Sequence, residues 1–208
     1  MRKVLITLGD SWPEGAELGN GLRYGELLTQ QMQYHSFYNY GSGGASNEDM
    51  LYQLQKHIAE SMQPGDQTTA IFFLTNPART AHFPRFIDRE RLGKEIFDHF
   101  YRESHEIMRS SATVSALQKW CSALLIDDYY FAGWVRYANW LPGVDLSKIW
   151  DQGNETVADW FGATDHNGEH LLGVVDNPYI RPNFAHPNQL GHNLIADRLR
   201  SWIQSCNK

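Results

Sequence analysis

Four short apolar runs alternate with longer segments in which apolar residues recur at helical spacing. The runs cover residues 4–8, 36–40, 70–74 and 123–126. Such alternation predicts a parallel β-sheet whose strands are joined by crossover helices. The first and third runs are nearly all apolar, which is typical of strands buried on both faces. We therefore expect a three-layer, doubly wound (flavodoxin-like) α/β fold with helices on both sides of the sheet.

The helical segments fall between and after these runs. Residues 22–33 and 48–62 read as crossover helices, and the second is opened by Ser46 or Asn47 as a cap and closed by Pro64-Gly65. We expect one or two helices within 85–120, with these residues facing inward: Phe97, Phe100, Tyr101 and Ile107. Residues 189–204 predict a closing helix that packs on the sheet through one face, made of Leu190, Leu194, Ile195, Leu199 and Ile203.

The interval 129–176 lacks a steady period. It is rich in tryptophan, glycine and acidic residues, and we expect an irregular excursion that shapes the substrate side. No repeat or low-complexity linker interrupts the chain, so we expect residues 1–208 to form a single domain. A length of 208 residues with 42% hydrophobic residues is enough for one sizeable core.

Charge and composition exclude several classes of function. The net charge of −6 offers no basic stripe for nucleic acid. No apolar run approaches the roughly 20 residues of a spanning helix, and the first residues read as a strand rather than a signal peptide. Cys121 and Cys206 are far apart and are expected to be reduced structural thiols. We therefore expect a cytoplasmic protein, or a component of a larger soluble assembly or oligomer, without membrane partners.

In an open parallel sheet, ligands bind beyond the carboxyl ends of the strands. After the first run comes Gly9-Asp10-Ser11, where a serine on a tight turn suits a nucleophile but equally suits a helix cap. After the second comes a glycine-rich segment, 39–47, whose N–H groups can converge on a small anion. It lacks the lysine of a phosphate loop.

Two more polar residues stand at corresponding places. Asn76 follows the third run, where its amide can complete an oxyanion hole or cap a helix. His186 sits on a Pro turn ahead of the last helix. A lone histidine is usually structural, but here a serine, two candidate oxyanion donors and a histidine fall where one crevice collects them.

These segments resemble the blocks of the SGNH (GDSL-type) hydrolase family, in the same order and over the whole chain. Gly-Asp-Ser with Gly15 four residues after the serine matches the first block. Gly44, Asn76 and His186-Pro187 match the block glycine, asparagine and histidine. The resemblance implies that Ser11 is the nucleophile and His186 its base. It also implies an oxyanion hole made of the Ser11 and Gly44 N–H groups and the Asn76 amide.

The chain departs from the family pattern at Asn183, where the family usually has an Asp three residues before the histidine. An Asn can orient the imidazole but cannot offset the charge of the imidazolium. The third catalytic member is therefore Asn183, a backbone carbonyl, or an acid from elsewhere, such as Asp127, Asp128 or Asp176. The third block also has Pro77 where an Asp is frequent.

The implied reaction is ester hydrolysis through an acyl-enzyme on Ser11, with no metal or cofactor. The expected substrate is a small-molecule or carbohydrate ester. Trp12, Trp134, Tyr137 and Trp140 could stack on sugar rings, which would suit a carbohydrate O-acetyl ester, but we favour core or interface roles for them.

Two alternatives come from other classes. Asn183 fits a binding or structural module that keeps the fold without activity, although the other block residues argue against decay. A metal site could draw on a set of acids and histidines, but an Asn-Gly turn between His166 and His170 disfavours it. That set is Asp165, His166, Glu169, His170, His186 and His192.

Overall fold

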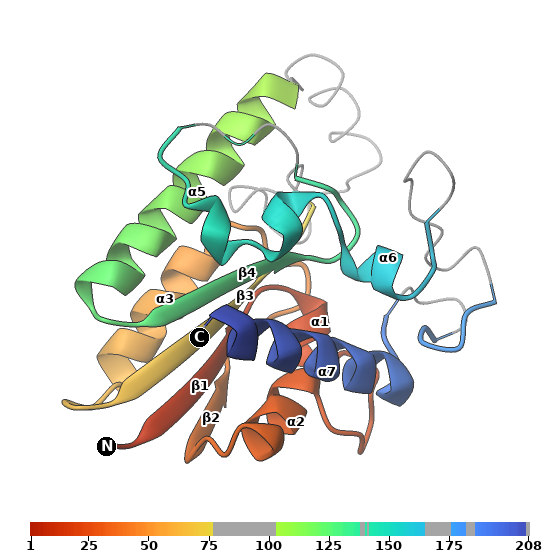
Figure 1. Cartoon of the computed structure of the whole chain (residues 1–208), viewed down its shortest axis with the longest axis horizontal. Helices are drawn as coiled ribbons and strands as arrows, with labels where there is room; N and C mark the ends of the chain where they lie inside the picture. Colours follow the sequence, from red (N-terminus) through yellow and green to blue (C-terminus); the bar gives the residue numbers. More distant parts are fainter. Residues whose placement is uncertain (77–102, 138–139, 141, 165–175, 182–185, 207–208) are drawn as a thin grey trace.

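The described part of the chain forms a parallel four-stranded sheet in the order β2-β1-β3-β4 (Figure 1). The strands are β1 (Lys3–Leu8), β2 (Ser36–Asn39), β3 (Gln67–Leu74) and β4 (Asp127–Ala132). The structure is a computed structural model that describes residues 1–76, 103–137, 140, 142–164, 176–181 and 186–206. The strand order is the flavodoxin-like one, as predicted.

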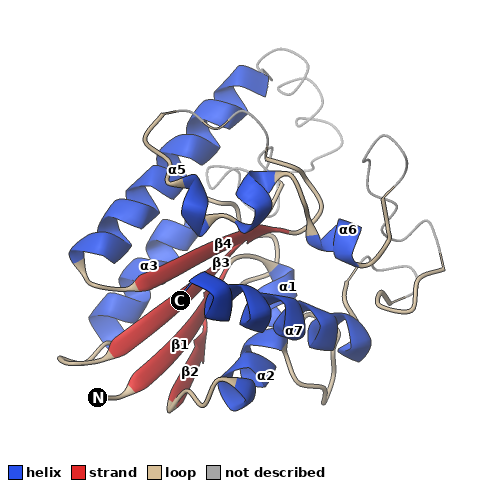
Figure 2. Ribbon diagram, in the orientation of Figure 1, coloured by secondary structure: helices blue, strands red, loops and turns tan. Residues whose placement is uncertain are grey.

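Helices cover both faces of the sheet (Figure 2). On one face lie α2 (Tyr24–Gln31) and α7 (Gln189–Cys206), and on the other lie α3 (Asp49–Glu60) and α5 (Glu103–Ala123). The short α1 (Ser11–Glu14) follows β1 directly. After β4 come the 3₁₀ helices η1 (Leu146–Lys148) and η2 (Trp150–Gly153), and then α6 (Val157–Trp160). The three-layer prediction is confirmed.

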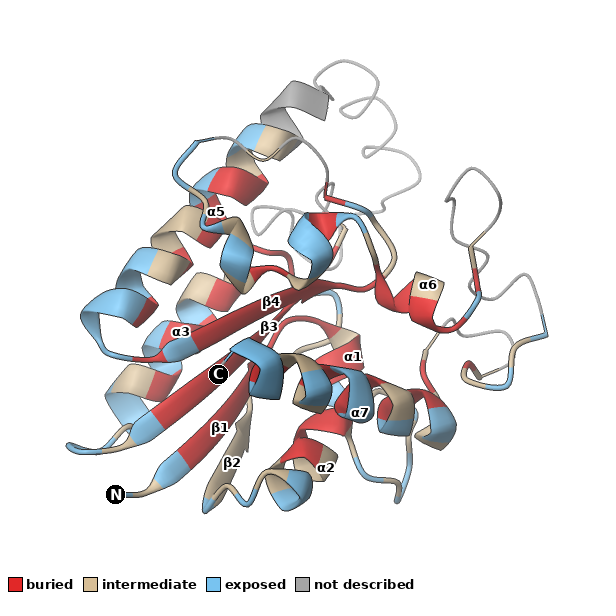
Figure 3. Ribbon diagram, in the orientation of Figure 1, coloured by how far each residue is buried: buried red, intermediate tan, exposed pale blue. Residues whose placement is uncertain are grey.

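Each central strand sends alternate side chains into two separate cores. In β1, Leu5 packs into the core under α2 and α7, whereas Val4 and Ile6 pack into the core under α3 and α5. All three are fully buried, and β1, β3 and β4 are buried along nearly their whole length, whereas the edge strand β2 is half-buried (Figure 3). Side chains of a strand point alternately to opposite faces, and here both faces are covered, so the strand must be apolar throughout.

The fourth strand is not where the sequence predicts it. The predicted strand at 123–126 is wrong, because α5 continues to Ala123 and β4 begins at Asp127. The Asp127-Asp128 pair looks like the polar end of a strand but is its start. Asp128 is buried, with Lys148 Nζ 3.7 Å from its carboxylate. Burial raises the pKa of Asp128 despite the lysine. β4 thus takes the first residues of the interval predicted to be irregular.

The other predicted helices agree with the structure more closely. Segments 22–33, 48–62 and 189–204 correspond to α2, α3 and α7. Leu190 was expected to face inward and is instead 55% exposed, because Gly191 and His192 occupy the buried positions of that turn. Ile107 on α5 is half-buried. The predicted inward positions Phe97, Phe100 and Tyr101 lie outside the described residues.

Two remaining expectations concern cysteines and membranes. Both cysteines are free thiols, with Cys121 buried and Cys206 exposed. Burial raises the pKa of the Cys121 thiol well above its usual range. Within the described residues, every helix is too short or too polar to cross a bilayer.

Candidate active site

The turn after β1 presents Ser11 at the carboxyl edge of the sheet. Gly9 has a φ of +135°, and a Cβ added there would lie 2.8 Å from the Phe73 carbonyl oxygen, so the turn requires glycine. Asp10 then caps α1, because its Oδ1 accepts a hydrogen bond of 3.0 Å from the Trp12 N–H. Ser11 is the first residue of that helix, with a half-buried side chain.

Buried side chains from two other elements hold this turn. The Gln53 amide on α3 pairs with both polar groups of Gly9, accepting from its N–H at 2.8 Å and donating to its carbonyl at 2.9 Å. Thr75, just beyond β3, donates its hydroxyl to Asp10 Oδ2 at 2.7 Å. Leaving a buried polar group without its partner costs about 1–3 kcal/mol. The position of the nucleophile is therefore tied to the stability of the fold.

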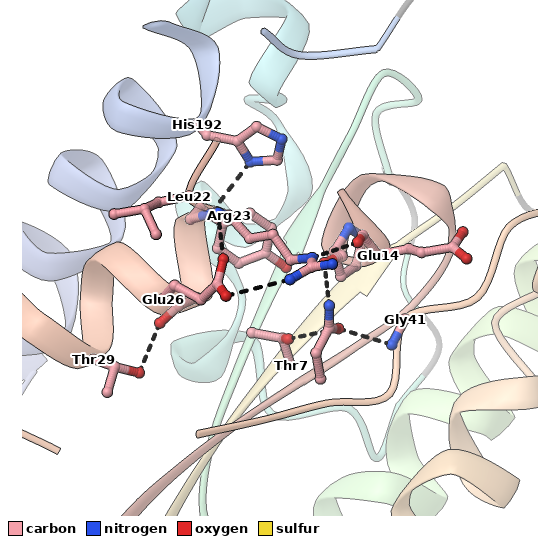
Figure 4. A network of polar contacts seen from close by, with 12 residues as sticks. Thr7, Glu14, Leu22, Arg23, Glu26, Thr29, Gly41 and His192 are labelled. Atoms are coloured by element: carbon pink, nitrogen blue, oxygen red, sulfur yellow. Dashed lines mark hydrogen bonds and ion pairs between the residues drawn. The ribbon is translucent and has the colours of Figure 1, made fainter. Parts of the chain in front are cut away.

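The loop after β2 is fastened to α1 through Asn39. Its Nδ2 donates to the Pro13 carbonyl at 2.7 Å, and its Oδ1 accepts from Thr7 Oγ1 and Gly41 N–H, each at 3.0 Å (Figure 4). A Cβ on Gly41 would lie 2.5 Å from the Glu14 nitrogen. Only glycine allows this loop to approach the helix so closely.

The same loop continues past the nucleophile. A Cβ added at Gly43 would lie 4.0 Å from Ser11 Cβ, so the Gly43 backbone borders the serine directly. Gly44 follows with a φ of +76°, and a Cβ there would meet open space. The candidate oxyanion donor Gly44 is therefore the next residue along a segment that runs beside Ser11.

Asn76 lies at the carboxyl edge of β3, the strand next to β1. Asn47 holds the preceding residue, since its Oδ1 accepts from the Thr75 N–H at 2.9 Å and its Nδ2 donates to the Thr75 carbonyl at 3.4 Å. The Tyr137 hydroxyl donates to the same carbonyl. Asn47, predicted only as a possible helix cap, is thus a clamp that fixes the backbone next to Asn76.

His186 meets Ser11 across 175 residues of sequence. Its Nε2 lies 3.0 Å from Ser11 Oγ, which is hydrogen-bonding distance. A short antiparallel bridge between Ile180 and Pro187 supports the histidine turn, and the Arg181 N–H donates to the His186 carbonyl at 2.9 Å. α7 begins three residues after the histidine. The pairing of serine and histidine that the block pattern implies is present in the geometry.

The other nitrogen of His186 faces an acid that the sequence does not suggest. Nδ1 lies 3.3 Å from Glu17 Oε2. Glu17 stands six residues after Ser11, in the turn between α1 and α2. Its side chain is 34% exposed and that of His186 is 23% exposed. A serine, a histidine and a carboxylate thus lie in one line of contacts, the arrangement of a catalytic triad.

The acidic residues that the sequence offered as the third catalytic member do not contact His186 in the described residues. Asp127 and Asp128 begin β4, at the edge of the sheet opposite the carboxyl ends of the strands. Asp176 is exposed, and in the described residues no hydrogen bond joins it to His186. Asn183 lies outside the described residues, as do the candidate metal ligands at 165–170. Among the residues that the structure describes, no cluster of three or more His, Cys, Asp or Glu side chains could hold a metal ion.

No family model and no curated protein matches the chain. Several solved structures resemble it over nearly its full length, including these three. The psychrotrophic esterase EstA from Pseudoalteromonas sp. is 13% identical, with 99% of each chain covered and a TM-score of 0.53. The acetyl xylan esterase Axe2 from Geobacillus stearothermophilus, solved as a W215I variant, is 14% identical, with 96% of this chain and 94% of that chain covered and a TM-score of 0.52.

The third is a protein from Desulfitobacterium hafniense, assigned to the lipolytic G-D-S-L family. It is 13% identical, with 96% of this chain and 98% of that chain covered and a TM-score of 0.50. The chain has the fold of the SGNH (GDSL-type) hydrolases. In this SGNH fold, Ser11, the 41–44 loop and Asn76 all lie beyond the carboxyl ends of neighbouring strands, where ligands bind in open α/β sheets.

The histidine of α7 has a structural role in this fold. His192 is buried, and its Nδ1 accepts a hydrogen bond of 3.2 Å from the Tyr24 N–H at the start of α2 (Figure 4). Burial, with the nearby Arg23 charge, lowers the pKa of His192 to about 4. The imidazole is therefore neutral at neutral pH, and it joins α7 to α2.

The aromatic residues next to the site belong mainly to the core. Trp12 is 1% exposed and stacks on Phe73 and Phe161, with ring centroids 5.3 and 6.1 Å apart. Trp134 is half-buried, and its ring centroid lies 5.3 Å from that of Trp12. Tyr137 is buried and stacks on Trp140. The core interpretation is thus correct for Trp12 and Tyr137, which have no exposed face for a sugar.

Proposed function

We propose that the chain is a serine ester hydrolase. The observation that carries the proposal is the 3.0 Å contact between Ser11 Oγ and His186 Nε2 at the ligand-binding edge of an SGNH fold. A hydroxyl is a weak nucleophile until a neighbouring base accepts its proton, and an imidazole at this distance can do so. The similarity of this fold to the folds of known esterases supports the same reaction.

The reaction proceeds in two steps. His186 Nε2 takes the proton of Ser11 Oγ as that oxygen attacks the ester carbonyl, and the same imidazolium then protonates the departing alcohol. Water, deprotonated by His186, next cleaves the acyl-serine to release the acid and free Ser11. The oxyanion of each tetrahedral intermediate is assigned to the Ser11 and Gly44 N–H groups and the Asn76 amide.

The proposal is tested by labelling the whole protein with a fluorophosphonate and locating the modified residue by mass spectrometry. We expect the label on Ser11, and we expect Ser11→Ala and His186→Ala to abolish hydrolysis of p-nitrophenyl acetate while remaining folded. Labelling of another serine would refute the assignment. Lack of labelling, with no ester hydrolysed, would favour the alternative of a non-catalytic module.

The narrower proposal is a carbohydrate O-acetyl ester as substrate. It draws on the half-buried Trp134 beside the Ser11 turn and on the shared fold of Axe2, which is an acetyl xylan esterase. Trp12 contributes no sugar platform, since it is buried. Release of acetate from acetylated xylan at a higher kcat/KM than from p-nitrophenyl acetate, and loss of that preference in Trp134→Ala, would support it. Equal preference in both proteins would contradict it.

A further inference from the structure

We propose that Glu17 is the acidic positioning residue of His186, in the role that the SGNH pattern gives to an Asp at position 183. This inference rests on the proposed hydrolase function. It differs from the family pattern in both the residue type and its place in the chain, because Glu17 comes from the turn that follows the nucleophile rather than from the histidine turn.

The two ring nitrogens of His186 have separate partners. Nε2 is 3.0 Å from Ser11 Oγ, and Nδ1 is 3.3 Å from Glu17 Oε2. A carboxylate only accepts hydrogen bonds, so this contact favours the tautomer with its proton on Nδ1. Nε2 is then left with a lone pair toward the serine hydroxyl, as a general base requires. The negative charge also stabilises the imidazolium that forms during attack.

A closed set of contacts keeps Glu17 beside the histidine turn. The Arg181 guanidinium donates to the Glu17 carbonyl, and the Arg181 N–H donates to the His186 carbonyl. The main chain of Glu17 is therefore bound to Arg181, and its side chain to His186. The contacts join the acid to the base through the backbone as well as through the carboxylate.

The turn that carries Glu17 is also fixed at both ends. On the α1 side, Arg23 Nε donates to the Glu14 carbonyl at 2.6 Å (Figure 4). On the α2 side, the Gln189 amide accepts from the Leu22 N–H at 2.8 Å and donates to the Leu22 carbonyl at 3.0 Å. Gln189 is the first residue of α7, so the segment that positions His186 also holds this turn.

The backbone of Glu17 adopts a conformation that residues with a side chain rarely take. Its φ is +65°, a left-handed conformation that glycine adopts readily and a residue with a Cβ adopts at a cost. A glycine would suit the turn better, yet the residue present carries a carboxylate to the histidine. Unfavourable backbone geometry retained at a site is typical of functional positions.

The decisive variants are Glu17→Gln, which removes the charge, and Glu17→Gly, which removes the side chain and relieves the backbone. Loss of the acid in a serine-protease triad lowers turnover about 10⁴-fold, and the partial exposure of this pair reduces the expected loss to about 100-fold in kcat. KM should change by no more than about twofold, because the carboxylate acts through His186 rather than on the substrate. Glu17→Asp should retain more activity than Glu17→Gln.

Structural and positioning roles predict opposite results for Glu17→Gly. A structural role would lower its unfolding temperature, whereas the positioning role predicts an unchanged or higher one with low kcat. Glu60→Gln is the control, because it removes the same charge from an exposed position at the end of α3, away from the carboxyl edge of the sheet, and it should keep turnover within about threefold of wild type.

A second measurement is independent of turnover. In nitrogen-edited NMR spectra of the full chain, the His186 Nδ1 proton should resonate far downfield in the wild type and move upfield in Glu17→Gln. Wild-type turnover in Glu17→Gln with that resonance unmoved would overturn the role of Glu17 while leaving the hydrolase intact. A large loss in Asn183→Ala alone would return the role to Asn183. Absence of Ser11 labelling would refute the proposed function itself.

Discussion

The turns that carry Ser11 and His186 meet at one point but are built differently. Around Ser11, the bonds from Gln53 and Thr75 are buried and reach into the centre of the sheet. Around His186, the contacts from Glu17 and Arg181 are partly exposed. Buried polar bonds are costly to break, whereas exposed ion pairs contribute little to stability. Changes on the serine side should therefore affect folding, and those on the histidine side mainly activity.

Asn76 should show the largest effect, and it tests whether the serine side also holds a purely catalytic group. Loss of one oxyanion donor typically lowers kcat about 100- to 1,000-fold, and we expect Asn76→Ala to fall in that range with little change in KM. The measurement is steady-state hydrolysis of p-nitrophenyl acetate, alongside thermal unfolding.

Asn47 provides the matched variant for this test, since it is an asparagine that clamps the residue next to Asn76. Asn47→Ala should lower the free energy of unfolding by about 2 kcal/mol, because it leaves the buried Thr75 N–H without a partner, whereas the Thr75 carbonyl keeps the Tyr137 hydroxyl. If Asn76→Ala destabilised the fold and kept its turnover, Asn76 would belong to the structural network and not to the oxyanion hole.

Gln53 tests the serine side for stability. Gln53→Leu would leave the buried N–H of Gly9 without its partner and its carbonyl with the Ser42 N–H alone, and we expect a loss of about 3 kcal/mol in the free energy of unfolding. Urea denaturation measures it. Gln31→Leu is the control, because Gln31 makes an exposed bond to Asp197 and should change stability by less than about 0.5 kcal/mol. Equal effects of the two substitutions would remove the distinction between the turns.

The same distinction explains what the sequence could predict. The serine turn, the glycine loop and His186 stand directly after strands or before a helix, so their places follow from the order of elements. The predicted position of β4 ended before residues 127–128, whereas the strand begins there. A buried aspartate at the start of a strand looks the same in sequence as a polar residue at the end of one.

Glu17 could not be inferred in the same way. It lies in a turn without periodicity, and its contact with His186 depends on the Arg181 bridge between segments 164 residues apart. The signal that the sequence does offer is an acid between Gly15 and Gly19, within a turn that begins right after the nucleophile helix. Such a residue can reach the ligand edge of the sheet, but its direction is set by tertiary contacts alone.

The smallest expected effect concerns the buried part of the histidine side, the link between His192 and α2. The pKa of His192 is about 4 in the folded chain against an ordinary 6.5, so the unfolded chain binds more protons between these values. Stability is then fully present above pH 6.5 and falls as the pH drops toward 4, by about 2 kcal/mol between pH 7 and pH 5. His192→Gln keeps an acceptor for the Tyr24 N–H but does not titrate. The unfolding free energy of this variant should therefore fall by about 2 kcal/mol less than that of the wild type between pH 7 and pH 5. His57, whose pKa burial also lowers, is present in both proteins and cancels in the comparison. Urea denaturation of both proteins at pH 7 and pH 5 measures the difference. If both proteins lost the same stability between pH 7 and pH 5, burial would not keep His192 neutral. The contact that stabilises the histidine side would then have to lie elsewhere on α7.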